Sequence, residues 1–184
     1  MITVYYSPHA TSVDNEAGRA SGHADVPLSI KGLQKAEELG AHYAAIPIDA
    51  VYCSDLQRAN RTSQIAFSAR NIPIIPDARL REFDYGDMTQ CVRDELGLED
   101  HITKPFPKGE SIEMAVERVG DFLREILPKC EGKTIVVIGH TATKYGLEYW
   151  SGERTLEDVV KTPWQWLAVP IWRYTFDYPL KRLK

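Results

Sequence analysis

Short apolar runs alternate along this chain with longer amphipathic stretches. Three runs are rich in β-branched and aromatic residues: ITVYYS at 2–7, DAVYCS at 49–54 and TIVVIG at 134–139. Runs this uniformly apolar are typical of strands that are buried on both faces of a parallel sheet. We therefore expect three parallel strands at these positions.

The stretches between the runs repeat their apolar positions with the period of a helix. The first follows Ser29, and the other two follow Asp55 and Ser111, both candidate N-caps. The apolar stripes are Leu33, Ala36, Gly40 and Tyr43; Leu56, Ala59, Ser63 and Phe67; and Ile112, Ala115, Val116, Val119, Phe122, Leu123, Ile126 and Leu127. Strands that alternate with helices in this way predict an α/β fold built from βαβ units.

Two further segments complete the expected fold. The segment WQWLAVPIWRYTF at 164–176 favours another strand, and Pro170 within it favours a sheet edge or a bulge. Residues 84–110 are polar and contain two prolines, which predicts an irregular excursion over one face. The length of 184 residues suits one domain over residues 1–184, with a core that is stable unaided.

Composition and charge narrow the classes of partner. The chain is 43% hydrophobic and 26% charged, its mean hydropathy is -0.32, its net charge is -4 and its pI is about 5.8. These values predict no broad attraction to nucleic acid or to an anionic membrane. No membrane-spanning run or signal-peptide pattern is present, and three widely spaced cysteines suit reduced thiols without zinc pairing. We expect a cytoplasmic protein.

Candidate catalytic residues gather at the predicted carboxyl ends of the strands, where ligands bind in open α/β sheets. The first run delivers His9, the run at 134–139 delivers His140 before a helix start at Thr141, and the run at 49–54 leads to Arg58. A neutral imidazole can attack phosphorus, while an arginine and a second histidine stabilise the phosphoryl oxygens. A carboxyl group could protonate the leaving alkoxide, and LREFDYGD offers Glu82, Asp84 and Asp87.

These residues stand in an ordered series of motifs that resembles the histidine phosphatase (phosphoglycerate mutase-like) superfamily. The family opens on Arg-His-Gly-Glu-Thr, then Asn, then Gly-Arg, and here His9, Asn15, Gly18 and Arg19 are in register. Five further segments match in order up to about residue 150: DVPLSIKGLQKAEELG, CSDLQRANRTSQIA, RLREFDYGD, KGESIEMAVERV and VVIGHTATKYGLE. The resemblance implies a three-layer sandwich in which helices flank a mostly parallel central sheet.

The resemblance also implies a role for each candidate residue. His9 is expected to be the phosphorylated nucleophile, and Glu82 the proton donor and later the base that activates water. Arg58 and His140 would bind the phosphoryl oxygens, Asn15 would donate a further hydrogen bond, and the backbone at Thr141 would line the pocket. No metal and no cofactor are expected.

One departure from the family pattern affects the phosphate site. Pro8 stands where the family carries its first arginine, and losing one charged hydrogen bond costs about 1.5–3 kcal/mol if nothing replaces it. Arg19, Lys144 or Arg61 could supply the missing charge. The expected function is a phosphatase acting on a small phosphorylated metabolite; the alternatives are mutase-type phosphoryl transfer and a catalytically weak phospho-ligand-binding module. The sequence is compatible with a homodimer but does not determine the oligomeric state.

Overall fold

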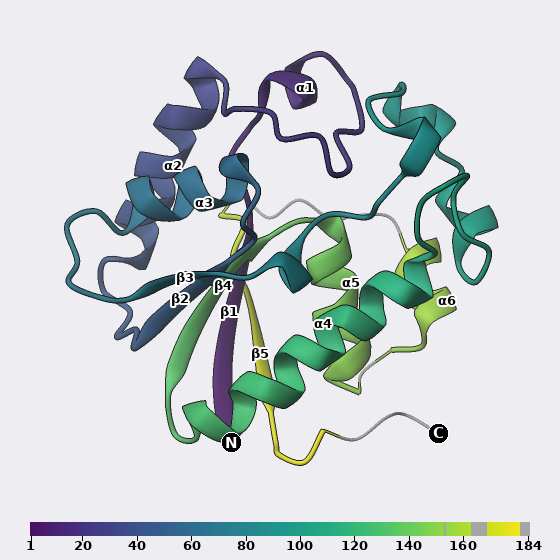
Figure 1. Cartoon of the computed structure of the whole chain (residues 1–184). Helices are drawn as coiled ribbons and strands as arrows, with labels where there is room; N and C mark the ends of the chain where they lie inside the picture. Colours follow the sequence, from purple (N-terminus) through teal and green to yellow (C-terminus); the bar gives the residue numbers. More distant parts are fainter. Residues whose placement is uncertain (153, 163–168, 181–184) are drawn as a thin grey trace.

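A single five-stranded sheet forms the centre of the computed structural model, which describes residues 1–152, 154–162 and 169–180. The strand order is β3–β2–β4–β1–β5 (Figure 1). Strands β3, β2, β4 and β1 pair with one another in parallel, and β5 runs antiparallel to β1. The strands are β1 (Ile2–Pro8), β2 (Ala50–Cys53), β3 (Ile74–Pro76), β4 (Thr134–Gly139) and β5 (Trp172–Phe176).

Helices cover both faces of the sheet, which gives three layers (Figure 1). Strand β4 makes this plain, because its side chains alternate between two hydrophobic clusters. Ile135 and Val137 pack with residues of α4 and α5, whereas Val136 and Ile138 pack with residues of α2 and α3. The expected three-layer α/β fold with a mostly parallel sheet is confirmed. The helices are α1 (Val13–Glu16), α2 (Ile30–Tyr43), α3 (Gln57–Ala66), α4 (Ile112–Ile126), α5 (Thr141–Trp150) and α6 (Leu156–Lys161), with 3₁₀ turns η1 (Ala78–Leu80), η2 (Gly86–Met88), η3 (Arg93–Glu95), η4 (Leu98–His101) and η5 (Leu127–Cys130).

Of the two helix N-caps predicted from the sequence, one is confirmed and one is wrong. The hydroxyl of Ser111 accepts a hydrogen bond from the amide of Met114 at 3.2 Å, so Ser111 caps α4 as predicted. The prediction that Asp55 caps the next helix is wrong. Its carboxylate accepts two hydrogen bonds from Arg81, at 2.7 and 2.5 Å, and α3 begins after Leu56 without a side-chain cap.

The last strand closes one edge of the sheet. Residues 172–176 form β5, and Pro170 lies just before it, where no hydrogen bond to a neighbouring strand is required. The edge position that Pro170 predicted is therefore confirmed for this strand. The earlier part of the expected strand, at 164–168, lies outside the described residues.

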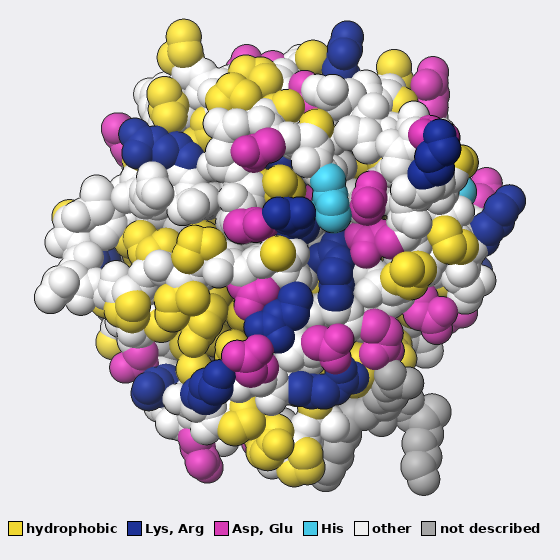
Figure 2. Space-filling model, viewed as in Figure 1, with side chains coloured by type: hydrophobic (Ala, Val, Ile, Leu, Met, Phe, Trp, Pro, Cys, Tyr) yellow, Lys and Arg dark blue, Asp and Glu magenta, His cyan; other side chains and the backbone are white. Residues whose placement is uncertain are grey.

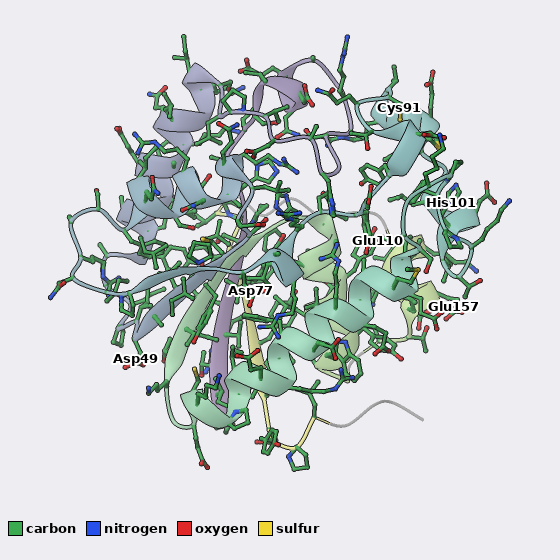
Figure 3. All side chains as sticks on the ribbon, viewed as in Figure 1. Asp49, Asp77, Cys91, His101, Glu110 and Glu157 are labelled. Atoms are coloured by element: carbon green, nitrogen blue, oxygen red, sulfur yellow. The ribbon has the colours of Figure 1, made fainter. Side chains whose placement is uncertain are left out.

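The excursion at 84–110 is anchored at its base. The amide of Asp84 donates to the Glu110 carboxylate at 2.9 Å, and the amide of Glu110 donates back to the carbonyl of Asp84 at 3.0 Å. Glu110, just before α4 (Figure 3), also forms an ion pair with Arg118 at 2.6 Å. Leu96 and Phe106 join the main hydrophobic cluster, so the excursion packs against the fold although it contains only three short 3₁₀ turns.

Opposite charges are mixed on the surface. Figure 2 shows Lys and Arg side chains interspersed with Asp and Glu over the face in view, rather than gathered by sign. No helix in the described ranges combines the length and the apolar composition needed to cross a bilayer.

Candidate active site

The parallel pairing of β1 with β4 brings two histidines together. Pro8 lies opposite Gly139 in the register, and the amide of His9 donates to the carbonyl of Gly139 at 2.9 Å. Each strand ends at that point, so His9 and His140 follow side by side with ring centroids 4.9 Å apart. The sheet therefore places both imidazoles at its carboxyl edge, as the sequence predicted.

A backbone contact sets the tautomer of His9. Its Nδ1 lies 2.6 Å from the carbonyl oxygen of Ala10. A carbonyl oxygen can only accept, so in the neutral ring Nδ1 carries the proton and Nε2 carries the lone pair. Burial, and secondarily the charge of Arg58, lower the pKa of His9 to about 3. The ring is therefore neutral at physiological pH, the form in which it can act as a nucleophile.

His140 is buried beside it and has unused hydrogen-bonding capacity. The residue is 1% exposed, and neither ring nitrogen has a hydrogen-bond partner among the described residues. Burial, followed by the charge of Arg58, lowers the pKa of His140 well below its usual value. Buried polar atoms without partners are costly, so these nitrogens fit a ligand that supplies them.

Arg58 approaches the same point from α3. It is 1% exposed, and its two terminal nitrogens donate to the carbonyls of Ala24 at 2.9 Å and Gly22 at 2.8 Å. Its Nε is buried without a partner in the described structure. These contacts fix the guanidinium and leave its Nε–H without a partner, so that this group can serve a ligand.

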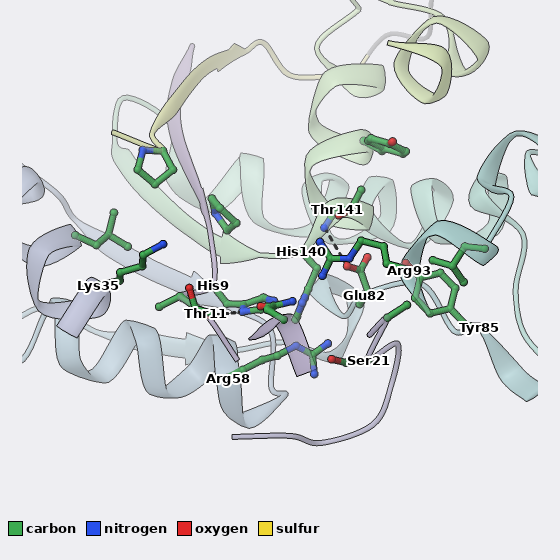
Figure 4. A pocket seen from close by; sticks show the side chains of 18 of the residues that line it. His9, Thr11, Ser21, Lys35, Arg58, Glu82, Tyr85, Arg93, His140 and Thr141 are labelled. Atoms are coloured by element: carbon green, nitrogen blue, oxygen red, sulfur yellow. Dashed lines mark hydrogen bonds between the residues drawn. The ribbon is translucent and has the colours of Figure 1, made fainter. Parts of the chain in front are cut away.

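Glu82 occupies the start of α5. Its carboxylate accepts hydrogen bonds from the amides of Thr141 at 3.3 Å, Ala142 at 3.0 Å and Phe83 at 3.0 Å. Figure 4 shows Glu82 beside Thr141. The N-terminus of a helix is an anion-binding position, which here is filled by the protein's own carboxylate. A phosphoryl group in this cavity would share the amide of Thr141 with Glu82.

The backbone around Glu82 is held by two residues that the sequence did not single out. His23 Nε2 lies 2.8 Å from the carbonyl oxygen of Glu82, and Arg118 donates to the same oxygen at 2.8 Å. Arg118 also donates to the carbonyls of Arg79 and Arg81. The sequence did not mark Arg118 or His23 as site residues, because an arginine on an amphipathic helix and a histidine in a polar loop are typical of protein surfaces.

Asn15 contributes through one end of its side chain. Its Oδ1 accepts a hydrogen bond from the amide of Ser12 at 3.0 Å, and its own amide donates to the Ser12 hydroxyl at 3.1 Å. The carboxamide oxygen is therefore engaged in capping α1. Only the NH₂ group of Asn15 can serve a ligand, which agrees with the expected donor role.

These residues line one cavity of about 630 Å³. All six residues expected at the site contribute to its wall: His9, Asn15, Arg58, Glu82, His140 and Thr141. The described residues contain no group of three or more His, Cys, Asp or Glu side chains placed to hold a metal ion. Further wall residues that the sequence did not assign to the site are Lys35, Glu38, His42, Tyr85, Arg93, Leu96, Leu98 and Tyr145.

The residues expected to replace the missing arginine lie elsewhere. Lys144 forms an ion pair with Glu148 and lies 5.4 Å from the ring of Trp172. Arg19 forms a backbone bridge with Val92. Arg61 is exposed on α3 and donates to Gln64. None of the three lines the cavity, so the structure corrects this expectation.

Cys53 is not a candidate nucleophile. It is fully buried in β2, and burial raises the pKa of its thiol to about 11. All three cysteines are free thiols. The wall of the cavity contains no cysteine, so its candidate nucleophile is an imidazole.

The sequence matches the profile of a known superfamily and a curated relative along most of its length. The sequence profile of the histidine phosphatase superfamily (branch 1) matches residues 5–175. A Citrobacter koseri protein named "Probable phosphoglycerate mutase GpmB" is 30% identical over 171 residues, which cover 84% of this chain and 80% of that protein.

Solved structures give the same result for the fold. Bacillus stearothermophilus YhfR superposes with a TM-score of 0.85 and 27% identity, covering 98% of this chain and 94% of that one. A phosphoserine phosphatase variant from Entamoeba histolytica, solved with phosphoserine, superposes with a TM-score of 0.79 and 21% identity, covering 98% and 93%. The observed fold is thus that of phosphoglycerate mutase-like proteins.

Proposed function

The chain belongs to the histidine phosphatase superfamily (branch 1), and from that premise we propose that it hydrolyses a small phosphomonoester through a phosphohistidine at His9. One observation carries the proposal. The neutral imidazole of His9, with its proton held on Nδ1 by Ala10, lies in one cavity with His140, Arg58 and Glu82. This set contains a nucleophile, donors for phosphoryl oxygens and a proton carrier.

The first step is attack by His9 on the phosphoryl group. The lone pair of Nε2 forms a bond to phosphorus while the bond from phosphorus to the ester oxygen breaks. Glu82, in its protonated form, gives its proton to the departing alkoxide. Arg58 Nε and the protonated ring nitrogen of His140 are buried, unused donors that can contact the non-bridging oxygens.

The second step returns the enzyme to its starting state. The Glu82 carboxylate takes a proton from water, and the water oxygen bonds to phosphorus as the bond to His9 Nε2 breaks. Inorganic phosphate leaves, and Glu82 is again protonated for the next cycle. No step needs a metal ion.

The wall of the cavity favours hydrolysis over transfer back to a sugar acid. Beyond the histidines, Arg58 and Glu82, the wall combines the charged side chains of Lys35, Glu38 and Arg93 with an apolar part formed by Leu39, Leu96, Leu98, Tyr85 and Tyr145. A phosphoglycerate carries two anionic groups on three carbons, so it could pair with the wall cations but would leave the apolar side chains uncovered. An ester with a partly apolar leaving group would bury them. Mutase activity is the second candidate, because a curated relative bears that name.

Turnover of an aryl phosphate in the presence of a chelator tests the proposal. The wild type should release phosphate, and His9→Ala should lose at least about a thousandfold of kcat/KM, as expected when a nucleophile is removed. His101→Ala is the matched control, because His101 stacks on Phe106 outside the cavity. Equal, negligible turnover by the wild type and His9→Ala would refute the enzymatic function and favour a phospho-ligand-binding module.

A second assay separates hydrolysis from mutase chemistry. Incubation with a phosphoglycerate, followed by ³¹P NMR, distinguishes free phosphate from phosphate that has migrated on the same carbon chain. Migration faster than release would replace hydrolysis by the mutase reaction. Loss of activity on chelation, restored by a metal, would refute the metal-free steps.

A further inference from the structure

The cavity has one arginine close to the nucleophile, Arg58, where the family pattern predicts two. Pro8, beside the nucleophile, lines the cavity without a charge, and the motif comparison predicts an arginine at that position in the family. Arg58 uses one N–H of each terminal nitrogen on a backbone carbonyl, and its Nε has no partner in the described structure. Among the described residues, Arg58 is the one arginine that the strands and α3 place in the wall of the cavity, whereas two guanidiniums could bind more of the phosphate oxygens.

The excursion brings another arginine to this cavity. A short ladder of backbone hydrogen bonds joins residues 90–93 to residues 18–20: Gln90 N to Ala20 O at 2.7 Å, Ala20 N to Cys91 O at 2.9 Å and Arg93 N to Gly18 O at 3.0 Å. Gly18 has a φ of 68°, which favours glycine at this turn. The ladder fixes the backbone of Arg93 beside the loop that follows the nucleophile.

The Arg93 side chain enters the cavity with its donors unused. It lines the cavity near Glu82 and Tyr85, on the side opposite Lys35 (Figure 4). Arg93 is exposed, and no hydrogen bond or ion pair engages its guanidinium within the described part of the chain. Its charge also acts on the nucleophile, since it contributes after Arg58 to the lowered pKa of His9.

We propose that Arg93 is the second cationic ligand of the phosphoryl group and takes the place of the arginine that Pro8 replaces. This inference rests on the proposed function only in requiring that the cavity binds a phosphoryl group. The guanidinium of Arg93 is free to bind two non-bridging oxygens, while Arg58 Nε and His140 contact the group from the buried side. Phosphate binding is thereby coupled to the excursion, because residues 90–93 carry this ligand.

Inhibition by inorganic phosphate tests the role of Arg93 directly, because free phosphate has no leaving group. Arg93→Gln should weaken phosphate inhibition and lower kcat/KM for an aryl phosphate, each by roughly 10- to 100-fold, as expected for one charged hydrogen-bonding group. Arg61→Gln, which removes an exposed arginine outside the cavity, should change neither quantity more than about twofold. Unchanged phosphate inhibition in Arg93→Gln would overturn the proposal and assign Arg93 to the leaving group.

A second variant tests the replacement itself. Pro8→Arg should recover most of the lost phosphate affinity in the Arg93→Gln background, yet add little to the wild type, because the two side chains would serve the same oxygens. Equal gains in both backgrounds would show independent sites and overturn the proposal. If the wild type turned over no substrate, calorimetric binding of phosphate by the same four proteins would still decide the role of Arg93, while the proposed hydrolysis would fail separately.

Discussion

Burial of the nucleophile in a neutral form should make the stability of the protein depend on pH. The folded pKa of His9 is about 3, whereas an unfolded histidine titrates near about 6.5. Between these pH values the His9 imidazole is protonated in the unfolded chain and unprotonated in the folded chain. The stabilisation is fully present above about pH 6.5 and is lost as the pH falls toward the folded pKa.

The magnitude follows from the two pKa values. At about pH 5, protonation stabilises the unfolded imidazole by about 2 kcal/mol and leaves the folded ring almost untouched. The free energy of unfolding should therefore fall by about 2 kcal/mol between about pH 7.5 and 5 because of His9 alone. For a chain of this length that corresponds to roughly 4–8 °C in Tm.

Urea denaturation of the wild type and of His9→Asn at the two pH values measures this contribution. Both proteins share every other titrating group, so the difference between their pH dependences measures the contribution of His9, including its effect on the pKa of the neighbouring His140. The wild type should lose about 2 kcal/mol more than His9→Asn on acidification. An equal loss in both proteins would show that His9 protonates as readily in the folded state as in the unfolded state. The lowered pKa of folded His9 would then be refuted.

Three further substitutions have expected outcomes. Glu82→Gln should lower kcat/KM for an alkyl phosphate by about 10²–10⁴ and kcat/KM for a nitrophenyl phosphate far less, since only the poor leaving group needs the proton and kcat/KM does not include the later attack of water; equal losses of kcat/KM would contradict the role of Glu82 as the acid. Arg58→Gln removes two charged hydrogen bonds to backbone carbonyls and should lower the free energy of unfolding by about 3–6 kcal/mol, whereas an unchanged urea midpoint would contradict this. Gly120→Ala places a Cβ 2.5 Å from the Trp150 ring between α4 and α5 and should lower the free energy of unfolding by about 1–3 kcal/mol. Gly132→Ala, where φ is 72° but the space is open, is the control that separates steric contact from backbone strain.

Local signals in the sequence predicted the elements whose determinants are themselves local. Ser111 caps α4 because a hydroxyl at that position reaches an amide three residues later, whatever the rest of the fold does. His9, His140 and Arg58 could be placed together because parallel strands end at the same edge of the sheet. These inferences need only periodicity and strand polarity.

The incorrect and missing assignments share a dependence on distant partners. Asp55 has the sequence pattern of an N-cap, but its carboxylate accepts hydrogen bonds from Arg81, which lies 26 positions later in the chain. Arg93 was not predicted as a site residue, because its position depends on the backbone hydrogen bonds that join the irregular excursion to residues 18 and 20. Lys144 looked available in sequence, yet Glu148 engages it one helical turn later. Such competition among charged side chains is decided by the tertiary structure.

Covalent labelling tests the central claim most directly. The wild type, mixed with a ³²P-labelled phosphomonoester and quenched within a fraction of a turnover, should carry an acid-labile, base-stable label. Peptide mapping should place that label on His9, and His9→Ala should carry none. A label found on another residue, or full turnover by His9→Ala, would contradict phosphoryl transfer through His9.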